Sequence, residues 1–180
     1  MRRGEVRPMK SMPRVLAILA LLIASTFAHT PAQAQTVERI DILQAGLYTA
    51  AVTGRAPAPG TTTGTTQLLG DIQFYQNTDR VPATIGTRFG VNYLVVGAPE
   101  GAMVELRQVW KLPAPGLRNP GNGNVYRETS RPLQKRIGDR NALTGYSFDD
   151  EWERVPGPWT LELWLGERRL LSKTFTVFKP

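Results

Sequence analysis

Four acidic residues gathered before a Pro-Gly pair form one group of side chains that could do chemistry. They are Asp149, Asp150, Glu151 and Glu153, with Arg154 beside them. Carboxylates crowded in a loop can bind Ca²⁺, and two carboxylates can serve as acid and base on a glycoside. The Asp-x-Asp-x-Asp-Gly spacing of a calcium loop is absent, and four local acids commonly form a solvated turn. We therefore predict no metal site and no catalytic residue, and keep Asp149 and Asp150 as candidate binding residues.

A second group is basic and occupies the segment 118–140. It consists of Arg118, Arg127, Arg131, Lys135, Arg136 and Arg140. Such a group can meet phosphate, anionic polysaccharide or lipid headgroups, or it can be a solvated face interleaved with acids. Apart from Tyr126, no aromatic residues accompany it, which argues against a single-stranded nucleic acid as the partner. Arg131, Lys135 and Arg136 are the candidate binding residues of this group.

Aromatic residues are the third group, and they have two readings. Tyr93, Trp110, Trp152, Trp159 and Trp164 could stack on a sugar, or they could pack in the core or a hairpin. Trp152 is the candidate binding residue among them, because it stands among charges.

The remaining chemistry is limited by two missing residue types. The chain has no Cys, and its one histidine, His29, lies in the N-terminal stretch. Hydrolase triads usually need a histidine base, and zinc, copper and haem sites rely mainly on His or Cys. We therefore predict a protein that is not an enzyme and binds no cofactor.

The N-terminal stretch has the pattern of an export signal. Basic residues dominate positions 1–14, an apolar run occupies 15–28, and Ala32-Gln33-Ala34 offers a small-residue cleavage site. The apolar run is shorter than the roughly 20 residues of a membrane-spanning helix. The pattern predicts a signal peptide over 1–34, cleavage after Ala34, no membrane span afterwards, and a periplasmic or secreted protein.

Residues 35–180 then form one domain's worth of chain, long enough to bury a core. The leader holds five basic residues and one acidic residue, so it carries +4 of the formal charge of +7. The remaining +3 argues only weakly for a nucleic-acid or membrane role.

After residue 35, apolar residues recur at every second position in short runs that Gly, Pro and Asn separate. This pattern is typical of an all-β domain. The expected strands cover 37–43 (continuing through 47–52 past a bend at Gly46), 68–77, 88–96, 103–112, an irregular edge strand within 125–137, 143–148, 159–165 and 171–178. Residues 54–67 and 113–124 are expected to be loops, and the strands 88–96 and 103–112 to form a hairpin. About seven strands in this space predict an immunoglobulin-like antiparallel β-sandwich, with an up-and-down barrel as the rival fold.

The C-terminal third also carries a family resemblance. The stretch YSFDDEWERVPGPWTLELWLGERRLLSKTFTVF, 146–178, resembles the closing strands of bacterial immunoglobulin-like accessory domains. Together with Ala45-Gly46-Leu47-Tyr48-Thr49, it resembles an uncharacterised bacterial family, domain of unknown function 3859, over most of residues 37–178. The resemblance implies the fold and carries no activity or functional residue.

Three functions remain open. The leading hypothesis is an exported, non-enzymatic module that binds a protein or an envelope component, because loops and sheet edges of a rigid sandwich are common recognition sites. The second is a carbohydrate-active or carbohydrate-binding protein that uses carboxylates of the 149–153 loop. The third is a structural envelope protein.

Overall fold

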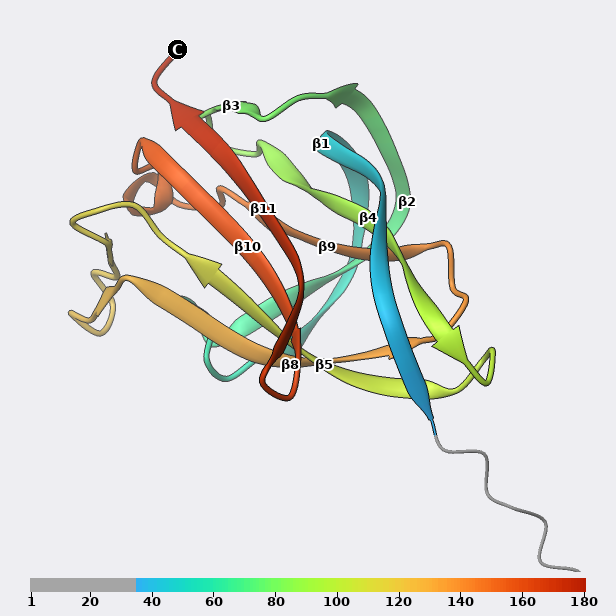
Figure 1. Ribbon diagram of the computed structural model, residues 1–180. Coiled ribbons are helices and arrows are strands. Elements are labelled where there is room, and N and C mark those ends of the chain that lie inside the picture. The colour runs from blue at the N-terminus through green and yellow to red at the C-terminus, as the bar shows by residue number, and fades with distance from the viewer. Residues whose placement is uncertain (1–34) are drawn as a thin grey trace, which may run out of the picture. The chain divides into compact units, whose positions relative to one another are not determined.

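The alternating apolar residues build two sheets that pack face to face (Figure 1). The computed structural model describes residues 35–180, and the expected signal peptide over 1–34 lies outside the described residues. The first sheet has the order β2 (Thr65–Asn77), β1 (Thr36–Pro57), β4 (Arg88–Ala98), β9 (Ala142–Ser147). The second has the order β3 (Arg80–Pro82), β11 (Arg168–Phe178), β10 (Gly157–Leu165), β5 (Met103–Lys111), β8 (Glu128–Arg136).

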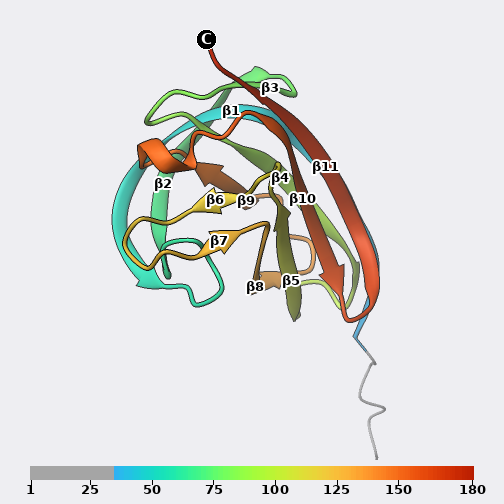
Figure 2. The same ribbon diagram turned by 90° about the vertical axis from the view of Figure 1, so that its left-hand side faces the viewer.

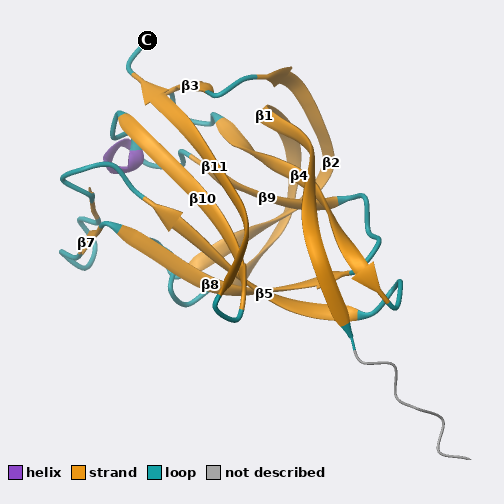
Figure 3. Ribbon diagram, in the orientation of Figure 1, coloured by secondary structure: helices purple, strands orange, loops and turns teal. Residues whose placement is uncertain are grey.

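Smaller elements complete the described chain. A two-stranded ribbon joins β6 (Leu117–Arg118) to β7 (Val125–Tyr126), and a single 3₁₀ turn, η1, covers Glu151–Glu153. All strand pairs are antiparallel except the short pair of β3 with β11. Figure 3 shows how strands dominate the described residues. Within residues 35–180, no helix has the length and apolar character needed to cross a membrane.

The core lies between the sheets and is rich in aromatic rings. Phe89 of β4 is its centre: its ring centroid is 5.6 Å from that of Trp110, 5.9 Å from Trp159 and 5.2 Å from Phe175. All four side chains are buried. Edge-to-face contacts of this kind add to the large apolar area that each ring removes from water. The second sheet therefore packs on the first without disulfides, since the chain has no Cys.

The predicted immunoglobulin-like sandwich is confirmed, and most strands lie where the alternation places them. The predicted edge strand within 125–137 is β8, at the end of the five-stranded sheet, and Pro132 lies within it. Pro is tolerated at this position because an edge strand need not donate a hydrogen bond on its free side. Trp159 and Trp164 are five positions apart on β10, and the first is buried while the second is half-buried.

Three local predictions are wrong, and the smallest error is the predicted loop 113–124, which contains the short strand β6 (Leu117–Arg118). The strands β4 and β5 do not form a hairpin: they belong to different sheets, and residues 99–102 carry the chain across the sandwich. Both strands turn large apolar side chains inward, so they face each other through the core rather than pairing edge to edge. The predicted loop 54–67 is also too long, because β1 continues to Pro57 and β2 begins at Thr65.

A bend in β1 divides that strand between two neighbours. Its first half pairs with β4 and its second half with β2, and Gly46 pairs with both Gly90 and Asn77. Gly46 has φ 148°, and a Cβ placed there would lie 2.0 Å from the backbone oxygen of Gln76. Only glycine fits this conformation and this close approach. The bend sends the second half of β1 and all of β2, residues 46–77, away from the sheet as a long hairpin, which we call the arm.

The arm crosses the open side of the sandwich. On that side the edge strands β8 and β9 have no strand partner between them, and Figure 2 shows the arm curving back toward β7 and β8. On the opposite side, β1 and β11 are joined by Arg168, which donates to the backbone oxygens of Val37 and Glu38. The two sides of the sandwich are thus closed by different means, and the arm leaves space beneath it.

Candidate functional site

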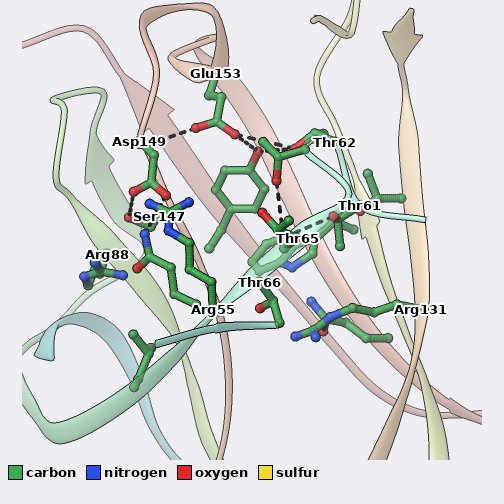
Figure 4. Close-up of a pocket in the computed structure, with 18 of the residues that line it drawn as sticks. Arg55, Thr61, Thr62, Thr65, Thr66, Arg88, Arg131, Ser147, Asp149 and Glu153 are labelled. Atoms are coloured by element: carbon green, nitrogen blue, oxygen red, sulfur yellow. Dashed lines mark hydrogen bonds between the residues drawn. The ribbon is translucent and has the colours of Figure 1, made fainter. Parts of the chain in front are cut away.

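A cavity of about 400 Å³ lies between the arm and the open side of the sandwich (Figure 4). The arm supplies one wall, the end of β9 with the 149–153 turn a second, and the strands β5 and β8 a third. This volume is within the range of cavities that hold small molecules. Most of the lining side chains are polar or charged, and threonines contribute many of them.

The tip of the arm is fixed to the sandwich by hydrogen bonds to the arm's backbone oxygens. The amide of Ser130 on β8 donates to the backbone oxygen of Gly60 over 3.1 Å. The side-chain amide of Asn119 donates to the backbone oxygen of Thr62 over 2.8 Å. Thr62 itself is buried. These contacts hold the arm over the cavity as part of its wall.

A buried carboxylate organises the turn that forms the second wall. One oxygen of Glu153 accepts from the Tyr146 hydroxyl over 2.7 Å, and the other accepts from the amides of Asp149 and Asp150 over 2.8 and 3.1 Å. Burial raises the pKa of the Glu153 carboxyl above its usual value, although these hydrogen bonds act in the opposite direction. Burial likewise raises the pKa of the Tyr146 hydroxyl well above its usual value. Both oxygens of Glu153 thus accept hydrogen bonds from the protein itself.

Asp149 is also held by the protein. Its carboxylate accepts from the Ser147 hydroxyl over 2.7 Å and from the side-chain amide of Gln67 on the arm over 2.7 Å. This second contact ties the arm to the turn. Because a carboxylate only accepts hydrogen bonds, the amide nitrogen of Gln67 must face Asp149, which fixes the direction of its oxygen.

Three arginines line the cavity without an acidic partner. They are Arg55 from the arm, Arg88 from β4 and Arg131 from β8. Among the ion pairs of residues 35–180, none includes any of these guanidinium groups. Arg131 donates its Nε to the side-chain oxygen of Gln108 over 2.9 Å, which orients the rest of the group. Its burial lowers its pKa from the usual value. Burial raises the pKa of the nearby Tyr48 to about 12, and the positive charge of Arg88 partly offsets this.

Two buried polar atoms of the lining residues have no hydrogen-bond partner. They are the indole nitrogen of Trp110, whose residue is 2% exposed, and the side-chain oxygen of Gln67. Most buried polar atoms in proteins are paired, so each exception calls for an explanation. One is a donor and the other an acceptor, and both belong to residues that line the same cavity.

The structure divides the predicted basic residues between two faces of β8. Arg131 lines the cavity. Lys135, four residues further along β8, donates to the backbone oxygen of Leu143 on β9 over 3.1 Å. Burial lowers the pKa of Lys135. Arg136 is exposed and donates to the backbone oxygen of Gly101 over 3.1 Å. The three side chains therefore do not form one patch.

Of the other predicted residues, two lie at the cavity and one does not. Asp149 and Asp150 are exposed residues of its lining. Trp152 belongs to η1, is half-buried, and packs against the core. Within residues 35–180, no three His, Cys, Asp or Glu side chains are close enough together to hold a metal ion.

Sequence reasoning did not single out the remaining polar residues of the cavity. Arg55, Gln67 and the threonines 61–66 belong to a segment that reads as a flexible loop. Arg88 stands at the start of a core strand, and Trp110 is only one of the aromatic residues that could stack on a sugar or pack in the core. No local pattern marks them, because the bend at Gly46 and the return of the arm bring them to one place.

Comparisons with known proteins agree with the fold. A crystal structure of an immunoglobulin-like protein from Pseudomonas aeruginosa is similar to this chain, with 26% sequence identity and a TM-score of 0.55. The similarity covers 79% of this chain and 99% of that one. No curated protein matches the chain. The sequence profile of the family described as domain of unknown function DUF3859 matches residues 36–177. That match spans nearly all of the described sandwich, and the chain therefore belongs to the DUF3859 family.

Proposed function

We propose that this protein is an exported, non-enzymatic binding module that holds a polar group of an envelope component in the cavity beneath the arm. The observation that carries the proposal is the cavity itself. It has the volume of a small-molecule site, and it gathers polar side chains from strands of both sheets and from the arm. The export-signal pattern of residues 1–34 supports the envelope as the place of action.

The state of the carboxylates favours binding over glycoside hydrolysis. A general acid must give its proton to the leaving group, which requires a carboxyl oxygen within reach of the substrate. Both oxygens of Glu153 accept hydrogen bonds from the protein, and so do both oxygens of Asp149. These groups shape the cavity wall and leave the ligand to other side chains.

A cavity-filling variant tests the proposal. Thr66 lines the cavity, and Thr49 is an exposed residue of the same arm outside it. We expect purified wild-type protein and Thr49→Trp to retain the same members of an array of oligosaccharides and peptides, and Thr66→Trp to lose them, because its ring occupies the space. Thermal melting of the three proteins would check that each is folded.

Two results would contradict the proposal. One is an array on which the wild-type protein retains nothing. The other is equal retention by wild type and a folded Thr66→Trp. Hydrolysis of any array member by the wild-type protein would overturn the non-enzymatic assignment.

A further inference from the structure

Among the charged side chains of the cavity, three arginines have no carboxylate partner within residues 35–180, whereas two of the three lining carboxylates are occupied and the third, Asp150, is exposed. The acceptor oxygens of Asp149 and Glu153 are occupied by Gln67, Ser147, Tyr146 and backbone amides. The three guanidinium groups, by contrast, have no carboxylate within ion-pair distance among the described residues. A ligand that satisfies these donors must be rich in acceptor oxygens.

The donors come from two parts of the structure, the sandwich and the arm, and those on the sandwich are held by burial or by a hydrogen bond. Trp110 is 2% exposed, and its N–H is the buried donor without a partner. Arg131, also on the sandwich side, is oriented by its 2.9 Å hydrogen bond to Gln108. Arg55 approaches from the arm (Figure 4). A guanidinium group binds planar or tetrahedral anionic oxygens with two parallel hydrogen bonds. The sandwich and the arm therefore both present positive donors to the same space.

One buried acceptor without a partner accompanies the donors. The side-chain oxygen of Gln67 is buried and has no partner, while Asp149 fixes the orientation of its amide. An inorganic anion without a proton cannot satisfy this oxygen, but a hydroxyl group can. A ligand that forms hydrogen bonds with both the positive donors and the Gln67 oxygen therefore carries an anionic oxygen group and hydroxyl groups on one small molecule.

We propose that the cavity recognises an acidic sugar, in which the anionic group meets the arginines and Trp110, and a hydroxyl meets Gln67. This inference rests on the proposed binding function and specifies the ligand class. The volume of about 400 Å³ suits one or two sugar units, or the acidic end of a longer chain.

Calorimetric titration of the purified protein tests the inference. The probes are glucuronate and galacturonate, which carry a carboxylate, glucose 6-phosphate, which carries a phosphate, and the neutral sugars glucose and galactose. We expect at least one acidic sugar to bind about ten-fold or more tightly than its neutral parent, since charge-assisted hydrogen bonds are the strong ones. The probe that binds most tightly identifies the anionic group that the cavity prefers. Higher ionic strength should weaken that binding.

Matched arginine variants locate the interaction. Arg131→Gln changes the cavity side of β8, and Arg136→Gln changes the exposed side of the same strand. We expect Arg131→Gln to lose about ten-fold or more in affinity for the acidic sugar and Arg136→Gln to stay within about two-fold. Arg55→Gln, on the exposed arm, should give a similar loss without altering the melting temperature. It therefore keeps the test valid should Arg131→Gln fail to fold.

The outcomes separate this inference from the proposed function. If neutral sugars or peptides bind in the cavity as tightly as acidic sugars do, the acidic class is wrong and the binding function stands. Equal affinities of Arg55→Gln, Arg136→Gln and wild type for the acidic sugar would also overturn the inference. If no probe and no array member binds, both proposals fall.

Discussion

The described chain buries two glutamates, one at the cavity and one on the outer face of the five-stranded sheet, and their surroundings are opposite. Glu162 of β10 forms ion pairs of 3.0 Å with Lys111 and 3.1 Å with Arg169, and accepts from the Trp164 indole over 3.0 Å. Glu153 forms no ion pair among residues 35–180, and its partners are the hydroxyls of Tyr146 and Thr62 and two backbone amides. The outer face thus pairs its buried charge with cations, whereas the cavity holds its charge with neutral donors.

The difference appears in the two pKa values. Burial alone would raise both. For Glu162 the hydrogen bonds from Lys111, Trp164 and Arg169, together with the charge of Lys111, outweigh burial and lower the pKa. For Glu153 burial prevails and the pKa is raised. The comparison also bears on function, because the cations of the cavity are not used to compensate its buried acid. They remain available to a ligand.

Removing Glu153 should have the largest effect. Glu153→Ala leaves the Tyr146 hydroxyl and the amides of Asp149 and Asp150 without their acceptor, so we expect a loss of about 2–4 kcal/mol in the free energy of unfolding, measured with urea. Glu151→Ala is the control on the same turn, because Glu151 is exposed and pairs only with Arg154. Its loss should stay below about 1 kcal/mol. Equal losses would show that the turn does not depend on Glu153.

Removing Glu162 should cost less. Lys111 and Arg169 are both about half exposed, with 51% of each side chain accessible, so water can solvate them once their partner is gone. We expect Glu162→Ala to lower the free energy of unfolding by about 1–2 kcal/mol. The companion variant Glu162→Gln keeps the shape and isolates the charge. A loss greater than that of Glu153→Ala would reverse the comparison between the two regions.

The smallest effect is on the pH dependence, and its sign differs between the two sites. The lowered pKa of Glu162 contributes stability that is present above the unfolded pKa, about 4.5, and is lost as the pH falls through the folded pKa. The raised pKa of Glu153 contributes stability that is present below about 4.5 and is lost as the pH rises through the folded pKa.

Urea titrations across pH 3–8 would measure both contributions. Relative to Glu162→Gln, the wild type should gain stability as the pH rises through this acidic range. Relative to Glu153→Gln, the wild type should lose stability as the pH rises. Differences of the same sign at the two sites would mean that their surroundings are not electrostatically distinct.

Much of the fold could be predicted because the information is local. A period of two in the apolar residues marks β4, β5, β10 and β11, and Gly or Pro marks the turns between them. The pairing of the strands was harder to predict from the sequence. The hairpin expected between 88–96 and 103–112 does not form, since alternation says which face of a strand is buried but not which edge it pairs with.

The candidate site shows the same limit. Asp149, Asp150 and Arg131 were selected from the sequence and lie at the cavity, whereas Lys135 and Arg136 were selected with Arg131 and lie elsewhere. The sequence alone could have shown that Arg136 lies on the opposite face of the strand from Arg131. It is five positions from Arg131, and an odd separation in a strand puts two side chains on opposite faces.

The sequence by itself determined that this chain forms a disulfide-free all-β domain, because its apolar residues alternate and it has no Cys, but it left a sandwich and an up-and-down barrel both open. It also placed a glycine at position 46, where the backbone must bend. Only the tertiary structure decided where the bend sends the arm. Arg55 and Arg131 are separated by 76 positions, and no short-range pattern links them. They come to one cavity because the arm crosses the open side of the sandwich and its tip bonds to β8.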